Sequence, residues 1–190
     1  EPHMSFKDGS VDVARVLADI EHLAAIESPT ASPEGVNRVL DAVAGLFTGT
    51  GASLQRERID PRFGEMLRVT CDPAASGPGI LVLSHMDTVH PLGTLAQGLP
   101  IRRDGDRLYG PGVFDMKGGA MLAVAAYRRM LAGNGASKLP ITFLFTPDEE
   151  NGSVASRKHI EAAAKQARYV LVTEPKRHGN RLVTSRKGTG

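Results

Sequence analysis

Six residues that could bind a metal ion or transfer protons lie in four short segments of the 190-residue sequence. Five of them follow closely after short apolar runs at 80–84, 141–146 and 169–173: His85, Asp87, Glu149, Glu150 and Glu174. The sixth, Asp115, lies in the glycine-rich segment 110–119. Carboxylates that converge without a counter-charge raise one another's pKa values, and a divalent cation removes this repulsion. Because the donors are histidine and carboxylates without a thiolate, the pattern predicts a catalytic zinc site or a related hydrolytic metal centre.

The carboxylates outnumber the ligands that one tetrahedral zinc needs. This excess favours two metal ions about 3.5–4 Å apart that share a bridging carboxylate. Glu149 and Glu150 are adjacent, so we expect one to bind metal and the other to act as general base. Asp87 lies two residues after His85, which puts both side chains on one face of an extended segment. We therefore expect Asp87 to accept the far N–H of His85 and fix its tautomer.

Each pattern taken alone has a simpler interpretation. A histidine and an aspartate two residues apart are often only a polar loop, and an acidic pair after a strand is typical of a solvated helix start. The spacing of Gly110, Gly112 and Asp115 resembles a dinucleotide-binding fingerprint but lacks its third glycine, so a nucleotide-binding domain is a weaker alternative. His90 and His178 do not directly follow a predicted strand, and we do not expect them to be ligands. The coincidence of the acidic residues at strand ends favours the metal site.

The surrounding elements are predicted from hydrophobic patterning. The runs 79–84, 141–146 and 169–173 are typical of strands buried on both faces. Helical patterns lie at 10–27, 33–47, 117–131 and 153–166, and two strands that we expect to be half-buried lie at 54–59 and 66–71. Alternation of strands and helices predicts an α/β layered sheet of mostly parallel strands flanked by helices. In such sheets the site lies beyond the carboxyl ends of the strands, where the candidate residues are found.

Composition excludes several classes of protein. Lys and Arg number 23 against 21 Asp and Glu, and this balance argues against a nucleic-acid partner. No apolar run approaches the roughly 20 residues of a membrane span, so we expect no membrane partner. The single cysteine, Cys71, excludes an internal disulfide framework. Residues 1–4 are typical of a cloning remnant, and the absence of an export signal after Met4 favours a cytoplasmic location.

The sequence resembles the M20 family of metallopeptidases in four ordered segments: Ser84-His-Met-Asp-Thr-Val89, Gly110-Pro-Gly-Val-Phe-Asp-Met-Lys-Gly-Gly119, Pro147-Asp-Glu-Glu-Asn-Gly152 and Thr173-Glu-Pro175. Within the family it is most similar to the glutamate carboxypeptidase (carboxypeptidase G2-type) branch. The resemblance implies a zinc-peptidase-like catalytic domain with two Zn²⁺ ions, for which Co²⁺ or Mn²⁺ could substitute. His85 and Glu174 would bind one ion, Glu150 the other, and Asp115 both. Glu149 would be the general base, and Asp87 would orient His85. The bond between residues 115 and 116 would be cis.

The resemblance also implies an activity. It predicts hydrolysis of a peptide or N-acyl amino acid by a dizinc-activated water, with release of a C-terminal, glutamate-like residue. Deacylation of an N-acyl amino acid and a non-catalytic metal-binding fragment are the alternatives. The family takes a last histidine ligand from beyond an inserted lid domain, through which it also forms homodimers. We therefore expect residues 5–190 to be the N-terminal part of the catalytic domain, truncated before that lid and inactive alone.

Overall fold

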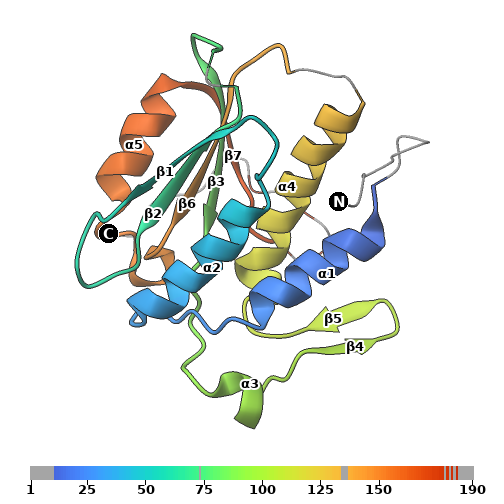
Figure 1. Cartoon of the computed structure of the whole chain (residues 1–190). Coiled ribbons are helices and arrows are strands. Elements are labelled where there is room, and N and C mark those ends of the chain that lie inside the picture. The colour runs from blue at the N-terminus through green and yellow to red at the C-terminus, as the bar shows by residue number, and fades with distance from the viewer. Residues whose placement is uncertain are drawn as a thin grey trace.

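A five-stranded sheet forms the centre of the chain (Figure 1). Its strands lie in the spatial order β1-β2-β6-β3-β7. In sequence order they are β1 (Ser53–Glu57), β2 (Met66–Thr70), β3 (Gly79–His85), β6 (Ile141–Thr146) and β7 (Ala167–Val172). Strand β3 is parallel to both β6 and β7, whereas β2 pairs antiparallel with β1 and β6. The three apolar runs thus form the parallel part of the sheet, and the predicted α/β class is confirmed.

The computed structural model describes residues 11–72, 74–133 and 137–177, together with residues 179, 181 and 183. The cloning remnant expected at residues 1–4 lies outside this part of the chain. Within the described residues, no helix combines the length and the apolar character that crossing a membrane requires.

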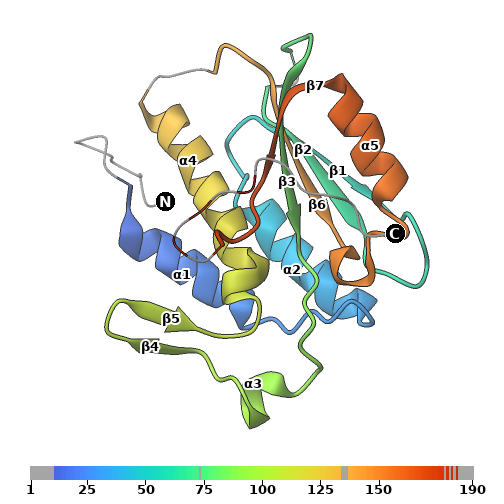
Figure 2. The same cartoon turned by 180° about the vertical axis from the view of Figure 1, so that it is seen from behind.

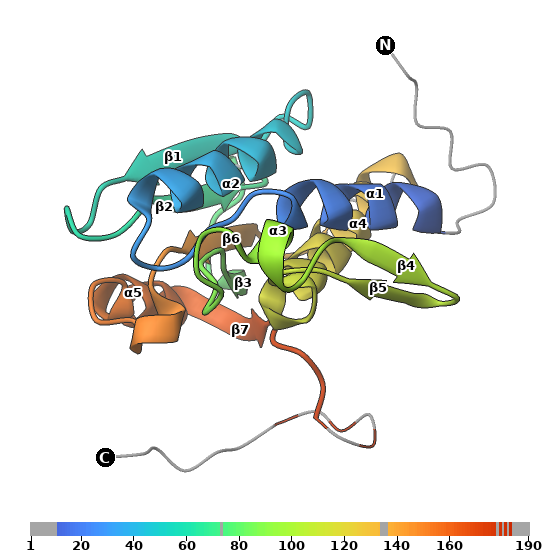
Figure 3. The same ribbon diagram turned by 90° about the horizontal axis from the view of Figure 1, so that it is seen from below.

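Helices cover both faces of the sheet, as Figure 3 shows. The helices α1 (Val13–Ala24), α2 (Pro33–Gly45) and α4 (Gly118–Ala132) pack on one face, and α5 (Arg157–Gln166) packs on the other. Helix α2 begins at a serine cap, because the Ser32 hydroxyl accepts the Gly35 N–H and Pro33 follows at the first helical position. Helix α1 is capped by the Asp12 carboxylate and ends at Ala24 rather than near residue 27.

The main core lies between the sheet and helices α1, α2 and α4. Phe143 of β6 packs edge-to-face on Phe47 with ring centroids 5.3 Å apart, and Tyr127 of α4 lies 5.9 Å from both rings. A smaller cluster under α5 contains Met66, Leu81, Leu144 and Ala163. The central strands are therefore covered on both faces, which explains their uninterrupted apolar sequences.

The segments that follow the parallel strands gather at one edge of the sheet (Figure 1). After β3 come α3 (Thr94–Gln97), the hairpin of β4 (Arg102–Asp104) and β5 (Arg107–Tyr109), and the irregular turn η1 (Val113–Lys117). After β6 comes the single turn η2 (Glu149–Asn151). The hairpin was not expected, because its sequence is mostly charged. Its two-residue loop begins with Gly105 at a φ of +59°, as tight hairpins require.

Three expectations about the outer elements were wrong. Strand β1 is exposed at all five positions rather than half-buried, because it is an edge strand and none of its residues belongs to either hydrophobic core cluster. Helix α5 begins at Arg157 rather than 153, because residues 148–156 form a separate turn. At the opposite edge, four apolar or aromatic side chains of β7 are 42–53% exposed: Tyr169, Val170, Leu171 and Val172. The prediction that the run 169–173 is buried on both faces is therefore wrong, because β7 is an edge strand whose apolar side chains are exposed.

Candidate metal centre

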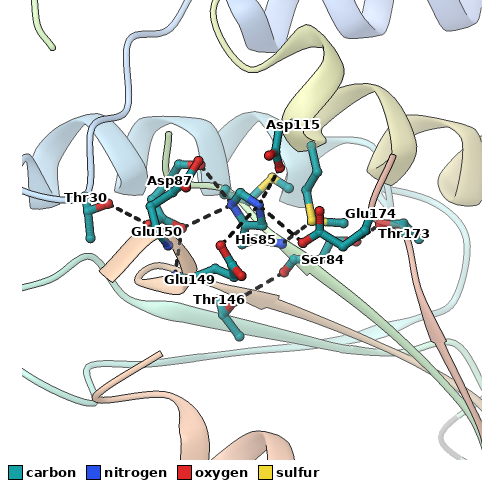
Figure 4. Close-up of polar contacts among 12 residues, drawn as sticks. Thr30, Ser84, His85, Asp87, Asp115, Thr146, Glu149, Glu150, Thr173 and Glu174 are labelled. Atoms are coloured by element: carbon teal, nitrogen blue, oxygen red, sulfur yellow. Dashed lines mark hydrogen bonds and ion pairs between the residues drawn. The ribbon is translucent and has the colours of Figure 1, made fainter. Parts of the chain in front are cut away.

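His85 is the centre of the candidate site (Figure 4). It is the last residue of β3 and is 2% exposed. Its Nε2 atom lies 3.1 Å from Oδ1 of Asp115, 3.7 Å from Oε1 of Glu174 and 3.9 Å from Oε2 of Glu149. These carboxylates come from η1, from the segment after β7 and from η2. The topology therefore brings residues that are far apart in the sequence around one imidazole nitrogen.

Two overlapping sets of three donors can each hold a metal ion. One set is His85, Asp115 and Glu150, and the other is His85, Glu149 and Glu174. Within each set the donor atoms lie within 4.8 Å of one another. The four residues predicted as ligands are thus brought together, with the predicted base Glu149 beside them. A buried imidazole with several carboxylates fits a divalent ion such as zinc. Which glutamate binds metal, and whether Asp115 bridges two ions, stay predictions.

Asp87 is fully buried and joins three segments of the chain. Its Oδ1 accepts the N–H of Glu149 at 3.2 Å, and its Oδ2 accepts the N–H of Glu150 at 3.2 Å and the Thr30 hydroxyl at 2.7 Å. The Nδ1 atom of His85 lies 2.9 Å from the Asp87 carbonyl oxygen and 3.3 Å from its Oδ1. The backbone of Asp87 therefore gives His85 its nearer partner, and the carboxylate mainly fixes the two adjacent glutamates.

Asp148 fixes the same turn from its other side. It is fully buried, and its Oδ2 accepts the N–H groups of Ala155 at 2.7 Å and Ser156 at 3.2 Å. Its carbonyl oxygen accepts the N–H of Ser153 at 2.9 Å. The turn that carries Glu149 and Glu150 is therefore closed on itself before α5 begins. Two buried aspartates, Asp87 and Asp148, hold the ends of this turn.

The electrostatics of the site favour a positive charge at its centre. Burial alone would lower the pKa of His85, but the hydrogen bond and charge of Asp87, with the charges of Glu174 and Glu149, outweigh it and raise the pKa to about 9. Burial raises the pKa values of Glu150 and Glu174, and the nearby Asp115 carboxylate raises them further. A cation at this point relieves the repulsion among the carboxylates. This electrostatic balance is what a metal site requires.

Asp115 is positioned by a turn that is anchored to α1. The peptide bond between Asp115 and Met116 is cis, as the resemblance implies. Lys117 is fully buried, and its Nζ donates to the carbonyl oxygens of Leu23 at 3.0 Å and Ile26 at 2.8 Å. The Leu23 carbonyl lies in the last turn of α1, and the Ile26 carbonyl follows just after the helix ends. Burial lowers the pKa of Lys117 to about 7. Lys117 therefore ties the turn that carries Asp115 to the first helix.

Glycine allows the next element to approach the end of β7. A Cβ atom added to Gly119 would lie 1.9 Å from the carbonyl oxygen of Thr173. No side chain fits there, so α4 can begin directly against the segment that carries Glu174. The hydroxyl oxygens of Thr173 and Ser84 lie 2.8 Å apart and join that segment to β3. Close packing at Gly119 is what places Asp115 beside Glu174.

Sequence reasoning did not identify all of the supporting residues. Thr30 and Asp148 were missed. Thr30 lies in no metal-ligand pattern, and its hydroxyl donates to the carboxylate of Asp87, which is distant in the sequence. The partners of Asp148 are backbone N–H groups, which any residue can supply. Lys117 lies in the glycine-rich segment that carries the resemblance, but nothing in the sequence indicates its carbonyl partners. The described residues offer no ligand group that includes His90, and His178 lies outside them.

The comparison with protein families decides the affiliation of the chain. Residues 81–184 match Peptidase family M20/M25/M40 over more than half of the chain. The chain belongs to this family. This M20 chain is 32% identical over 175 residues to carboxypeptidase G2 of Pseudomonas sp. (strain RS-16), which is 92% of the chain and 42% of that protein. It is 30% identical to a succinyl-diaminopimelate desuccinylase of Rhodopseudomonas palustris (strain TIE-1), over 79% of the chain and 41% of that protein.

Solved structures of M20 enzymes share the fold. The M20 family metallo-carboxypeptidase Sso-CP2 from Sulfolobus solfataricus superimposes with a TM-score of 0.68 at 20% identity, over 85% of this chain and 37% of that one. Human carnosine dipeptidase 1 gives a TM-score of 0.73 at 17% identity, over 86% and 39%. The chain thus spans less than half the length of the relatives that it matches.

Proposed function

We propose that the whole protein hydrolyses an amide or peptide bond and releases a C-terminal amino acid, with a glutamate-like residue preferred. One observation carries this proposal: a buried histidine and four carboxylates from three different segments converge at one edge of the sheet. The 32% identity to carboxypeptidase G2 supports the choice of the bond that is cleaved.

Two divalent ions, proposed to be zinc, complete the site. His85 and Glu174 would hold one ion, Glu150 the other, and Asp115 both. When bound, such ions polarise a carbonyl group and lower the pKa of water towards about 7. The donor set supports zinc, because imidazole and carboxylates are its usual ligands at catalytic sites.

Glu149 is proposed as the proton carrier. Its side chain is 47% exposed at the open edge, and its Oε2 lies 3.9 Å from the His85 ring, so it can reach both the site and a substrate. It would take a proton from the attacking water and hand it to the nitrogen of the leaving amine. The Asp87 carboxylate accepts the backbone N–H groups of Glu149 and Glu150, and so fixes the turn from which the two glutamate side chains extend.

Deacylation of an N-acyl amino acid is the second candidate function. Matches to succinyl-diaminopimelate desuccinylases at 30% identity and to an acetylornithine deacetylase of Myxococcus xanthus at 27% identity favour it. Both reactions cleave an amide bond, so the same residues would perform the same steps. The two candidates differ in the substrate, which a panel of peptides and N-acyl amino acids separates.

The two adjacent glutamates provide a matched experiment. In the whole protein we expect Glu149→Gln to keep the metal content and remove most turnover, because it deletes only the proton acceptor. We expect Glu150→Gln to lower the metal content, because it removes a ligand. Elemental analysis and kcat are measured on both variants and the wild type. The reverse pattern would show that the two roles are exchanged, and unchanged turnover in both would overturn the proposed mechanism.

The 190-residue chain alone is expected to be inactive. Two ions that share Asp115 leave the ion at Glu150 with only two protein ligands from this chain, whereas catalytic zinc normally has three. The ion at His85, Asp115 and Glu174 has three and is expected to bind more tightly. We further propose that the whole protein is a cytoplasmic homodimer that binds neither nucleic acid nor membranes.

A further inference from the structure

The ladder of hydrogen bonds between β3 and β7 ends just before the candidate metal centre. Its last bond runs from the Thr173 N–H to the carbonyl oxygen of Leu83 at 3.1 Å. In a regular parallel ladder the next bond would join the His85 N–H to the carbonyl oxygen of Thr173. The His85 N–H instead donates to the Sδ atom of Met116 at 3.2 Å. A methionine sulfur thus takes the place of a strand carbonyl at the end of β3.

The turn η1 and the first residues of α4 contact both strands where the ladder ends. Met116 of η1 contacts β3 through the His85 N–H. Gly119 of α4 lies so close to the carbonyl oxygen of Thr173 that no side chain fits between them. Figure 2 shows the segment after β7 passing beside the start of α4. A short stretch of chain therefore lies against the ends of both strands, at the point where His85 and Glu174 are found.

The contact between Met116 and His85 is buried. Met116 is 1% exposed and His85 is 2% exposed, so the sulfur, not solvent, accepts this N–H. A thioether sulfur is a weak acceptor, but a buried N–H that has no acceptor at all is destabilising. On the other side of β3 the ladder continues, because the Met86 N–H donates to the carbonyl oxygen of Thr146 at 2.9 Å. The sulfur therefore secures the side of β3 that faces β7.

We propose that Met116 is a positioning residue of the metal centre: its sulfur fixes the His85 backbone where the β3–β7 ladder stops, and so directs the imidazole towards the ion. The proposal rests on the metal centre of the proposed function. Asp115 directly precedes Met116, and its Oδ1 lies 3.1 Å from the Nε2 of His85. One turn therefore carries a ligand and also the acceptor that holds the neighbouring ligand. It thereby sets the distance between the two.

Replacement of the sulfur by a carbon group tests the proposal. Met116→Leu keeps an apolar side chain of similar size and removes the acceptor, and such exchanges are usually tolerated in cores. Met121→Leu is the matched control, because Met121 is 2% exposed in α4 and belongs to the main core. We expect Met116→Leu to weaken zinc binding by the 190-residue chain about tenfold, as does the loss of other groups that orient metal ligands. Zinc binding by Met121→Leu should equal that of the wild type.

Amide hydrogen exchange of the metal-free chain measures the hydrogen bond itself. In Met116→Leu the His85 N–H should exchange about tenfold faster relative to the Phe143 N–H of the same sample, because it has lost its acceptor. Phe143 lies in β6 and reports the opening of the sheet as a whole. Met121→Leu should leave this ratio unchanged. A residue that only fills space at position 116 would change neither the ratio nor the zinc affinity when leucine replaces it.

Failure of this proposal differs from failure of the proposed function. If Met116→Leu binds zinc as tightly as the wild type, or if the exchange ratio is unchanged, Met116 does not position His85 and the proposed function stands. An unprotected His85 amide in the wild type would show that the sulfur does not hold it. If the wild-type chain binds no zinc and the whole protein cleaves neither peptides nor N-acyl amino acids, the proposed function fails, and the proposal fails with it.

Discussion

Replacement of Asp87 by asparagine tests whether one buried carboxylate organises the site. The carboxylate is fully buried and accepts the Glu149 N–H on one oxygen and the Glu150 N–H and the Thr30 hydroxyl on the other. Asparagine has the same shape but only one oxygen. In either orientation of its amide, the NH₂ group faces the N–H of Glu149 or Glu150. One buried donor then loses its acceptor, and the remaining hydrogen bonds lose their charge.

The size of the effect follows from these contacts. A buried donor left without a partner costs about 1–3 kcal/mol, and hydrogen bonds to a charged group contribute about 1.5–3 kcal/mol. We therefore expect Asp87→Asn to lower the free energy of unfolding by about 2–4 kcal/mol. Thr30→Val removes only one of the three donors and should cost about 1 kcal/mol. Since Asp87 also fixes Glu149 and Glu150, we expect Asp87→Asn to weaken zinc binding by about 10–100-fold.

Urea denaturation and zinc titration of the same samples measure both quantities. Asp104→Asn is the matched control, because the Asp104 side chain is 69% exposed and its partner Arg102 is 3.4 Å away at the surface. Such a surface pair contributes about 0–1 kcal/mol, so this variant should resemble the wild type. If Asp87→Asn resembled Asp104→Asn in both unfolding and zinc affinity, Asp87 would not organise the site.

Three further predictions concern the surroundings of the site. Phe143→Ala should lower the free energy of unfolding by about 3–5 kcal/mol in urea denaturation, because its ring is 1% exposed and packs on Phe47, whereas a loss below about 1 kcal/mol would contradict this packing. Backbone hydrogen bonds from Gly93 and Leu95 lower the pKa of Glu27 below 4.5. The stability that the ionised Glu27 gives to the folded chain should therefore be fully present above pH 4.5 and be lost as the pH falls through the lowered pKa. Amide hydrogen exchange at Gly93 and Leu95 should accelerate when Glu27 is protonated, and Glu27→Gln should accelerate it about tenfold at neutral pH. Equal exchange rates in the variant and the wild type would show that the Glu27 carboxylate does not hold these two N–H groups. Leu171→Lys should reduce self-association of the concentrated chain in analytical ultracentrifugation, because β7 is an exposed apolar edge, and unchanged association would place the contact elsewhere.

The central parallel strands β3 and β6 and the residues after them could be predicted from the sequence because burial leaves a clear signal, whereas β7 has the same apolar pattern although it is an exposed edge strand. The runs that became β3, β6 and β7 are apolar without interruption, and parallel strands must end at the same edge. His85 and Glu174 could therefore be placed together before any contact was known. The glycines in the segment 110–119 indicate that another part of the chain approaches the start of α4 closely. They do not indicate that this part is Thr173.

The remaining features depend on contacts that leave no pattern. The β4–β5 hairpin is stabilised by its tight loop and by Arg102 over the Tyr109 ring, not by apolar alternation. Asp87 was expected to orient His85, but its carboxylate also accepts backbone N–H groups from a turn about 60 residues away. Any residue can supply a backbone N–H, so the sequence does not identify such partners. The start of α5 was misplaced for the same reason, since Asp148 holds the preceding turn through backbone groups.

Zinc titration of the 190-residue chain tests the central claim most directly. Isothermal titration calorimetry on the wild type is compared with Asp115→Asn and Glu174→Gln, whose side chains are 51% and 39% exposed, so that these changes should leave the fold intact. His159→Gln, on α5 with its Nδ1 3.7 Å from Glu57, is the control outside the site. We predict one firmly bound zinc in the wild type and in His159→Gln, and at least about tenfold weaker binding in Asp115→Asn and Glu174→Gln. No zinc binding by the wild type, or equal binding by all four proteins, would contradict the claim that these residues form a metal centre.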